Sequence, residues 1–394
     1  MPRTEEDALG EVTVPEDAYY GGFTRRASKN FAISDQRVPQ ELIANIARIK
    51  KAAARVNNDM GLLEDQKADV IQEAADEVID GVFDGAFPLD IIQAGAGTPM
   101  HMNVNEVIAN RATELLGGSK GEYIVDPHDD VNMGQSTNNV VPTALRLTVM
   151  DKLDQLCAVI DDLTVSFDTK ATRYDGLIKV GRTHLQDAVP VTVGQELASY
   201  AETCRIGERR LDQCEDELSI VGLGGNAVGT GINTPEGFRG ALVDELGRIT
   251  GRDLEPADDP VQTTQSMSVF ADVSGRVRSF VTDMIKISDD LMVLSSGPTA
   301  GIGEYELPEV EPGSSIMPGK VNPSIVEAFK MTCLDVVGND LTVTRAAEEG
   351  DLQMNVMAPV IAKNLCSGLD ELSRAIRMLE QRCIDELSID EQRV

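Results

Sequence analysis

The sequence has no tryptophan, and aromatic residues make up only 4% of its 394 residues. Its core must therefore be built from Leu, Ile, Val, Ala and Met, which suits packed helices better than a β-sandwich. No run approaches the roughly 18 consecutive apolar residues of a membrane span. The first seven residues also lack the apolar segment of a signal peptide. We expect a helical protein that works in the cytoplasm and has no membrane partner.

Positive charge is scarce. Lys and Arg total 35 against 66 Asp and Glu, which gives a formal net charge of −31. Nucleic-acid binding needs clustered Lys and Arg, so we expect no nucleic-acid partner. The acidic residues alternate with apolar ones along the whole chain, which argues against a disordered tail. An acidic surface with few lysines predicts a halophilic protein, which works in concentrated salt where charge repulsion is screened.

Metal-binding residues are also few. The chain has only three histidines, and none of its six cysteines forms a C-x-x-C pair. A zinc site is therefore not expected, and we predict neither a metal ion nor another cofactor. Most of the cysteines fall at apolar positions of helical segments, where a cysteine acts as a small buried hydrophobic residue.

Three long segments carry an apolar residue at alternating steps of three and four. Such spacing places one apolar stripe along a helix and predicts partner helices packed at a shallow angle. Stripes this regular favour a helix bundle, either shared between subunits or within a monomer. The three stripes are Leu145, Val149, Leu153, Leu156, Ile160, Leu163 and Phe167; then Leu197, Tyr200, Cys204, Gly207, Leu211, Cys214 and Leu218; then Phe270, Val273, Val277, Phe280, Met284, Ile287, Leu291 and Leu294.

Polar, glycine-rich segments separate these helices, and each adjoins helical sequence. A helix N-terminus has unpaired N–H groups and suits anionic ligands, so several converging ends would form a pocket for a dicarboxylate. Pro142 is predicted at a first helical position, with Ser136 and Thr137 either capping that helix or contacting a ligand. The segments are 95–98, 134–139, 181–184, 223–226 and 313–323.

The 313–323 segment carries the clearest chemical pattern. It holds two hydroxyls, a lysine and an asparagine among glycines and prolines, which predicts an irregular loop. Removing a proton next to a carboxylate needs a base and cationic or polar donors for the developing enediolate. Ser314 or Ser315 could supply the base, with Lys320 and Asn322 receiving the carboxylate. A purely structural turn between two helices is the alternative, and composition leaves both interpretations open.

Five segments, in order along the chain, resemble the signature motifs of the fumarase/aspartase superfamily. They are Gly95–Thr98, Met102–Ala112, Gln135–Asn138, Gly181–Ala188 and the 313–323 loop. The resemblance implies an all-α fold whose long central helices form a twenty-helix core in a homotetramer, with active sites shared between subunits. It implies an N-terminal helical domain over 1–133, a central long-helix domain over 134–378 that carries the loop, and a remnant of a small C-terminal domain over 379–394.

The resemblance also implies roles for individual residues in anti-elimination from a small dicarboxylate. Ser314 is the base, and Lys320 and Asn322 grip the substrate carboxylate. His184 contacts a carboxylate or an activated water and is oriented by Glu327. Further substrate contacts are expected from Thr98, Ser136, Thr137, Asn138, Thr183 and Arg26.

Each of these roles has a structural alternative. A histidine can be a buried residue with satisfied hydrogen bonds, but His184 lies in a polar motif, which favours a functional role. Glu327 and Arg26 can equally be surface charges. Ser136 and Thr137 can cap a helix and contact a substrate at the same time.

Small differences favour the aspartase type over the fumarase type, which implies that ammonia is eliminated from L-aspartate to give fumarate. Hydration of fumarate to L-malate is the alternative. Several positions depart from the family pattern, among them Asn139, Asn226 and Thr299, and the chain stops at Val394, where relatives continue. These departures keep open a third interpretation, a non-catalytic tetrameric scaffold of the same fold.

Overall fold

The computed structural model describes residues 2–394, which divide into two compact units, each built from separated stretches of chain. The first unit comprises the chain up to Met150 together with Glu215–Ala271 and Thr342–Cys366. The second comprises Asp151–Cys214, Asp272–Leu341 and Ser367–Val394. These units are not the consecutive segments 1–133, 134–378 and 379–394, which stay a prediction.

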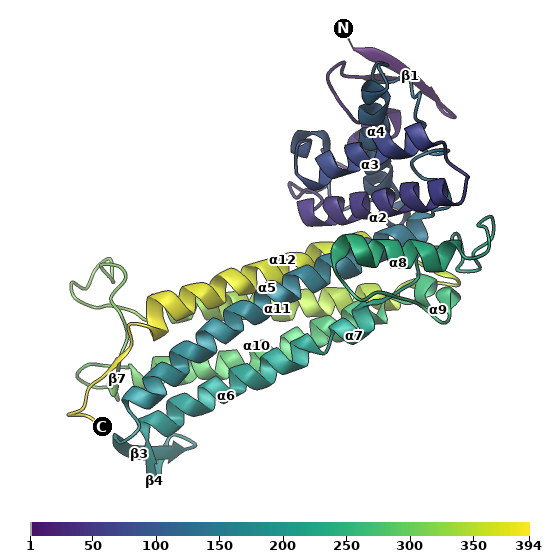
Figure 1. Cartoon of the computed structure of the whole chain (residues 1–394). Coiled ribbons are helices and arrows are strands. Elements are labelled where there is room, and N and C mark those ends of the chain that lie inside the picture. The colour runs from purple at the N-terminus through teal and green to yellow at the C-terminus, as the bar shows by residue number, and fades with distance from the viewer. Residues whose placement is uncertain (1) are drawn as a thin grey trace. The chain divides into compact units, whose positions relative to one another are not determined.

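The first unit begins with a hairpin and four helices (Figure 1). These elements are β1 (Arg3–Asp7), β2 (Gly10–Val14), α1 (Gly22–Asn30), α2 (Gln40–Asp59), α3 (Asp65–Ile79), α4 (Thr98–Leu115) and the short turns η1 (Asp84–Ala86) and η2 (Gly95–Gly97). Its later elements are α7 (Glu215–Leu218), β5 (Ile220–Val221), α8 (Phe238–Thr250), β6 (Glu255–Pro256), α9 (Pro260–Gln265), β8 (Gly350–Asp351) and β9 (Met354–Asn355).

Helix α2 forms the centre of the first unit. Leu42, Ile46 and Ile49 recur at steps of three and four and are fully buried. This stripe lets α2 pack against α3, α4 and α8. Lys50 lies in the same buried part of the helix, which is unusual for a charged side chain.

The second unit is a bundle of long helices. Segments of five helices run lengthwise beside one another (Figure 1). Polar contacts between these helices include an ion pair of Lys152 with Asp370 at 2.7 Å and a hydrogen bond from Tyr200 to Asp290 at 2.8 Å. Its elements are α5 (Thr137–Arg173), β3 (Ile178–Thr183), β4 (Gln186–Thr192), α6 (Val193–Asp212), α10 (Ser268–Leu294), β7 (Tyr305–Glu306), α11 (Ser324–Glu348), α12 (Ala358–Leu379), η3 (Glu380–Ile384) and β10 (Ser388–Ile389), of which α5, α10, α11 and α12 also supply residues to the first unit.

The three predicted apolar stripes are confirmed. Their Leu, Ile, Val, Met, Phe, Tyr and Cys side chains are all buried, at 7% exposure or less. Gly207 shows why the second stripe includes a glycine, since a Cβ there would lie 2.3 Å from the Phe280 ring. The regular spacing therefore predicts the bundle correctly, because each stripe lies mainly on the buried face of one long helix. The second stripe runs past the end of α6 at Asp212, and its last member, Leu218, belongs to the short helix α7.

The all-α fold class is confirmed, although the described residues also form five two-stranded sheets. The 181–184 segment was expected beside helical sequence, and it lies instead in the β3–β4 hairpin. The hairpin leads directly into α6, whose N-terminus is a capping box. Thr192 Oγ1 accepts from the Gln195 amide, and Gln195 Oε1 accepts from the Thr192 amide, each at 3.0 Å.

The predicted position of Pro142 is wrong. Helix α5 begins at Thr137, so Pro142 lies inside the helix. The helix starts earlier because Ser136 already supplies its first acceptors. The Ser136 carbonyl accepts from the amides of Asn139 at 3.1 Å and Val140 at 3.0 Å. Proline is tolerated so close to the N-terminus because it breaks only one hydrogen bond of the first turns.

Cysteine burial follows the prediction. All six thiols are free; five are buried and Cys157 is partly exposed. Burial raises the pKa of the Cys204 thiol to about 12, as expected of an inert core residue. In residues 2–394 we find no helix with the length and apolar character needed to cross a bilayer.

Candidate functional site

The predicted site residues fall into two sets, one in each compact unit, and the two sets are described separately. The first unit holds Arg26, Thr98, Ser136, Thr137 and Asn138. The second unit holds Thr183, His184, Ser314, Lys320, Asn322 and Glu327.

The N-terminus of α5 carries three residues of the first set. Ser136 precedes the helix, and its Oγ accepts from the Asn138 amide at 3.3 Å. The Asn138 side chain donates to the Ala227 carbonyl at 2.7 Å, which ties the helix start to the 223–226 segment. All three side chains of 136–138 are half-buried. The helix end therefore offers hydroxyls and a positive dipole end at the surface, which suits a carboxylate.

Thr98 lies beside this helix start. It begins α4 after two tight glycines, and Gly97 has a φ of +90°. A Cβ at Gly97 would also lie 3.2 Å from Val141 Cγ1, so glycine suits both the conformation and the space. The Thr98 hydroxyl donates to the Gly95 carbonyl at 2.6 Å and lies 3.4 Å from Thr137 Oγ1. The structure thus brings Thr98 and Thr137 together, and their substrate-binding role stays a prediction.

Two residues that the sequence did not single out as functional lie behind this pair. Lys50 and His101 are buried and hydrogen-bonded to each other through Nζ and Nε2. His101 Nδ1 lies 2.8 Å from Thr137 Oγ1, so the buried pair contacts a predicted substrate-binding residue. One signal could have found Lys50, since a lysine on the apolar face of a predicted helix is unusual.

A small cavity of about 280 Å³ adjoins the helix start. It is lined by Ser136, Gln135, Asn226 and Asn233 among others. Asn226 has a φ of +58°, and its Nδ2 donates to the Ile232 carbonyl at 2.7 Å. Asn139, the other departure in this region, is buried and donates to Thr264 Oγ1 at 3.1 Å. Asn139 therefore faces the protein interior, and Asn226 lines the cavity.

Arg26 is paired with a neighbouring hairpin. Its Nε lies 2.7 Å from Asp7 Oδ2, and its Nη2 donates to the Gly10 carbonyl at 2.7 Å. The hydrogen bond from Arg26 lowers the pKa of the Asp7 carboxyl. Arg26 thus anchors the β1–β2 hairpin to α1, and its substrate-binding role stays a prediction.

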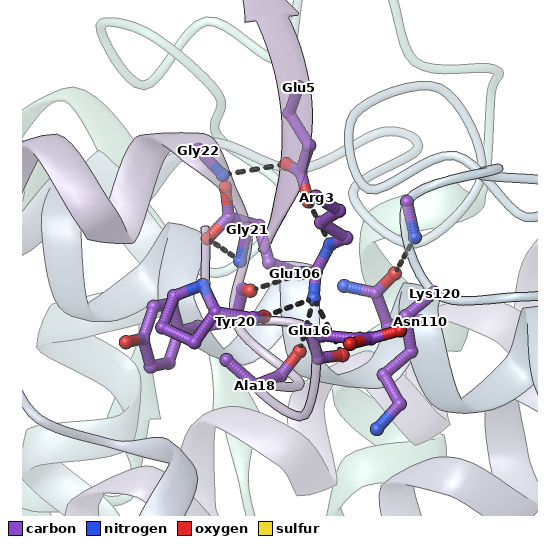
Figure 2. Close-up of polar contacts among 12 residues, drawn as sticks. Arg3, Glu5, Glu16, Ala18, Tyr20, Gly21, Gly22, Glu106, Asn110 and Lys120 are labelled. Atoms are coloured by element: carbon purple, nitrogen blue, oxygen red, sulfur yellow. Dashed lines mark hydrogen bonds and ion pairs between the residues drawn. The ribbon is translucent and has the colours of Figure 1, made fainter. Parts of the chain in front are cut away.

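Glu106, in the Met102–Ala112 motif, stabilises the start of helix α1. Its carboxylate accepts from the amide of Gly21 at 2.9 Å (Figure 2). It also accepts from the amides of Phe23 at 2.8 Å and Thr24 at 3.2 Å, at the N-terminus of α1. Arg3 lies beside it and donates to the carbonyls of Ala18 and Tyr20. Burial raises the pKa of Glu106 to about 7, against the hydrogen bonds that lower it. The Glu106 carboxylate therefore occupies the anion-binding position at the N-terminus of α1.

The 313–323 loop is irregular, as predicted, and is closed on itself. The Ser314 amide donates to the Lys320 carbonyl at 2.9 Å, and the Lys320 amide donates to the Met317 carbonyl at 3.1 Å. Gly313 has a φ of +82°, and a Cβ there would lie 2.1 Å from the Lys320 carbonyl oxygen. Only glycine fits this close approach of the backbone.

Ser314 Oγ accepts two backbone hydrogen bonds. The donors are the amides of Ile316 at 3.3 Å and Met317 at 3.2 Å. These bonds favour the deprotonated hydroxyl, because N–H donors stabilise negative charge on the oxygen. This geometry distinguishes Ser314 from Ser315, which chemistry alone left as equal candidates.

Lys320 and Asn322 also lie together. Lys320 Nζ donates to Asn322 Oδ1 at 2.7 Å, and the lysine is exposed. The pair presents a cation and an amide on one side of the loop. Glu327 is exposed in the first turn of α11. Among residues 2–394 no hydrogen bond joins Glu327 to His184, so that predicted pairing stays a prediction.

Thr183 and His184 lie at the tip of the β3–β4 hairpin. His184 and Leu185 have φ values of 55° and 63°, the conformation of a type I′ turn. Both Thr183 and His184 line a cavity of about 880 Å³ between the hairpin, α6 and α10, with Tyr200 and Lys286 also in its wall. Within the described part of the chain, no hydrogen bond joins His184 to Ser314.

The hairpin is held by a buried charge cluster. Glu304 is only 3% exposed and lies 2.6 Å from Arg182 Nη2 and 2.8 Å from Lys179 Nζ. Burial favours protonation of this carboxyl, but the hydrogen bonds from Arg182 and Lys179 outweigh it and lower the pKa of Glu304. The cluster fixes β3 immediately before Thr183.

Comparisons with known proteins agree with the family resemblance of the sequence. A model of a family described as lyase matches residues 10–338. The chain is 45% identical to an aspartate ammonia-lyase of Pseudomonas aeruginosa, over 99% of this chain and 83% of that protein. It is 42% identical to a class II fumarate hydratase of Ralstonia nicotianae, over 100% and 84%. A crystal structure of a fumarate lyase:delta crystallin from Brucella melitensis superimposes with a TM-score of 0.98 at 44% identity, covering 100% of this chain and 86% of that one.

Proposed function

This chain belongs to the fumarase/aspartase superfamily of lyases, and from that premise we propose that it is an aspartate ammonia-lyase, which eliminates ammonia from L-aspartate to give fumarate. The observation that carries the proposal is the 313–323 loop. It holds one hydroxyl under two backbone N–H donors, next to an exposed lysine paired with an asparagine.

We propose that Ser314 is the base. Its alkoxide removes the β-proton of aspartate, and the electron pair of that C–H bond moves toward the adjacent carboxylate. The enediolate that forms carries two negative charges on one carboxyl group, which Lys320 and Asn322 stabilise by charge and hydrogen bonding. The enediolate then collapses, the double bond of fumarate forms, and the C–N bond breaks to release ammonia.

The remaining donors bind the substrate in this proposal. Thr98, Ser136, Thr137 and Asn138 lie at or near helix N-termini, where backbone N–H groups favour a carboxylate. Thr183 and His184 contribute from the hairpin, with Glu327 orienting His184. Arg26 has the weakest support, because its guanidinium already pairs with Asp7.

We further propose a homotetramer with shared active sites. Apolar side chains are exposed along one side of α11, with Met331 at 59%, Leu334 at 55% and Leu341 at 65%. Their spacing of three and seven residues places them on one stripe, which fits a helix-to-helix contact between subunits. Sedimentation equilibrium should give four times the mass of the chain. A stable monomer would contradict this part of the proposal.

The choice of substrate, aspartate or malate, has the least support in this proposal. Relatives of both types match at similar identity, so fumarate hydratase is the second candidate. The residues favour the aspartase type because Asn138 is preceded by Ser136 and Thr137, whereas fumarases usually have two serines before this asparagine. A non-catalytic scaffold is the third candidate. It is disfavoured by the intact Ser314, Lys320 and Asn322.

One assay separates the three candidates. Purified protein in molar salt is mixed with L-aspartate, with L-malate or with buffer, and fumarate is followed by its ultraviolet absorbance. We expect fumarate to form from aspartate. Formation from malate alone would support the hydratase instead, and an intact tetramer that is silent with both would support the scaffold.

A further inference from the structure

Lys50 is a fully buried lysine on α2, and its Nζ makes three hydrogen bonds. It donates to Asn132 Oδ1 and to Gln135 Oε1, each at 2.8 Å, and its third partner is His101 Nε2. None of these partners is a carboxylate. A buried ammonium without an anion is costly, so this arrangement calls for an explanation.

The hydrogen bonds of the two amide partners fix their orientation. Gln135 Nε2 donates to the carbonyls of Val131 at 3.1 Å and Met133 at 3.3 Å. Asn132 Nδ2 donates to the Gln135 carbonyl at 3.3 Å. Both amide oxygens therefore face Lys50 and use two of its protons. What remains on Nζ, a third proton or a lone pair, faces His101.

The number of protons on the Lys50–His101 pair decides the state of the ring. When the pair carries one positive charge, the charge sits on Nζ or on the ring, and in both cases Nδ1 keeps its proton. When the pair is neutral and Nζ has a lone pair, that lone pair accepts from Nε2–H, and Nδ1 becomes an acceptor. Burial lowers the pKa of Lys50 and of His101 well below their usual ranges, so without a nearby anion the neutral pair is favoured. A carboxylate bound next to Thr137 would favour one positive charge on the pair.

The state of His101 Nδ1 sets the direction of the Thr137 hydroxyl proton. His101 Nδ1 lies 2.8 Å from Thr137 Oγ1. If Nδ1 is protonated, it donates to the hydroxyl oxygen, and the hydroxyl proton is free for another acceptor. If Nδ1 is an acceptor, the hydroxyl proton turns inward to it. The hydroxyl of Thr98 does not compensate, because it already donates to the Gly95 carbonyl at 2.6 Å.

We propose that, when a dicarboxylate is bound, Lys50 and His101 share one positive charge and act as positioning residues, which keep the Thr137 hydroxyl turned outward as a donor to a substrate carboxylate. The inference rests on the proposed function in that its ligand is a dicarboxylate. The anion would in turn offset the buried charge, since Thr137 begins α5 and is half-buried.

The state of the ring can be measured directly by ¹⁵N NMR. The chain has only three histidines, so ¹⁵N-histidine-labelled protein in the solid state gives one pair of ring signals, Nδ1 and Nε2, for each histidine, assigned with His128→Gln and His184→Gln variants. We expect His101 Nδ1 to be protonated when fumarate is bound. An unprotonated Nδ1 in the fumarate complex would overturn the proposal. This measurement needs no turnover, whereas failure of the proposed function would show as no fumarate from aspartate or malate.

A double-mutant cycle tests whether His101 acts through Thr137. The dissociation constant of fumarate is measured by calorimetry for the native protein, His101→Gln, Thr137→Val and the double variant. His101→Gln should weaken binding roughly tenfold when Thr137 is present, and should have little effect in the Thr137→Val background. Equal weakening in both backgrounds would overturn the positioning role. His128→Gln, at an exposed histidine, is the matched control and should bind as the native protein does.

Discussion

The amide of Ser314 donates to the carbonyl of Lys320 at 2.9 Å, and this bond closes the loop that carries the proposed base and the proposed carboxylate grip. The bond sets the spacing between the two functional residues without involving either side chain. Gly313 permits it, because a Cβ at that position would lie 2.1 Å from the Lys320 carbonyl oxygen. The loop geometry therefore depends on a backbone contact that only glycine allows.

Gly313→Ala should open this loop. We expect the turnover number to fall at least about tenfold while the melting temperature changes little, because the loop is largely exposed. Gly319→Ala is the matched control. Gly319 also has a positive φ, of +78°, but a Cβ added there would meet no atom within 4 Å. If both variants lost activity equally, backbone strain rather than the Ser314–Lys320 closure would be responsible.

Glu106→Gln should change the dependence of stability on pH. The native carboxyl has a pKa of about 7 against 4.5 for an ordinary glutamate, so the folded protein binds more protons than the unfolded chain between these values. Stability should therefore fall as pH rises through this window, by about 3 kcal/mol at most.

The measurement is the melting temperature across that window. Glu106→Gln should remove most of the slope, because glutamine does not titrate. Glu114→Gln, on the same helix but half-exposed, is the control and should keep the native slope. An unchanged slope in Glu106→Gln would assign the pH dependence to another group.

Glu304→Gln should destabilise the hairpin that carries Thr183 and His184. It leaves Lys179, which is 3% exposed, with Glu196 at 2.8 Å as its remaining carboxylate partner, and we expect such a change to cost about 1 to 3 kcal/mol. Calorimetry should show a clear drop in melting temperature. Asp187→Asn is the control, since Asp187 is exposed and lies 3.9 Å from Arg182, where an ion pair contributes little. Equal effects of the two variants would mean that the buried cluster does not hold the hairpin.

Salt should stabilise the protein. With a net charge of −31, repulsion between acidic residues opposes folding and assembly. The screening length falls from about 10 Å at 0.1 M salt to about 3 Å at 1 M. We expect both the melting temperature and lyase activity to rise over this range in KCl. A flat or falling response would contradict the prediction that the protein is halophilic.

The helix bundle could be predicted from sequence because burial in a long helix leaves a regular mark. Leu156 and Phe280 each sit where the three-and-four spacing places a buried residue. The β3–β4 hairpin has no comparable signal in the sequence. Its turn uses His184 and Leu185 at positive φ, where glycine or asparagine would have been the usual signal.

The candidate site was predicted in part for similar reasons. Lys320 and Asn322 lie two residues apart in one loop, so their contact is local and follows from the motif. The contact of Lys50 with His101 joins residues 51 positions apart on two helices, and a single sequence carries no signal of that pairing. The start of α5 was misplaced because Pro142 is a stronger sequence signal than the Ser136 cap.

The most direct test of the proposed mechanism compares Ser314→Ala with Ser315→Ala in fumarate formation from L-aspartate. Ser314 Oγ accepts from the amides of Ile316 and Met317, so only its loss should remove the base. We predict that Ser314→Ala lowers the turnover number at least about a hundredfold, with the tetramer intact, while Ser315→Ala stays within about threefold of the native rate. Native turnover in Ser314→Ala would contradict the mechanism.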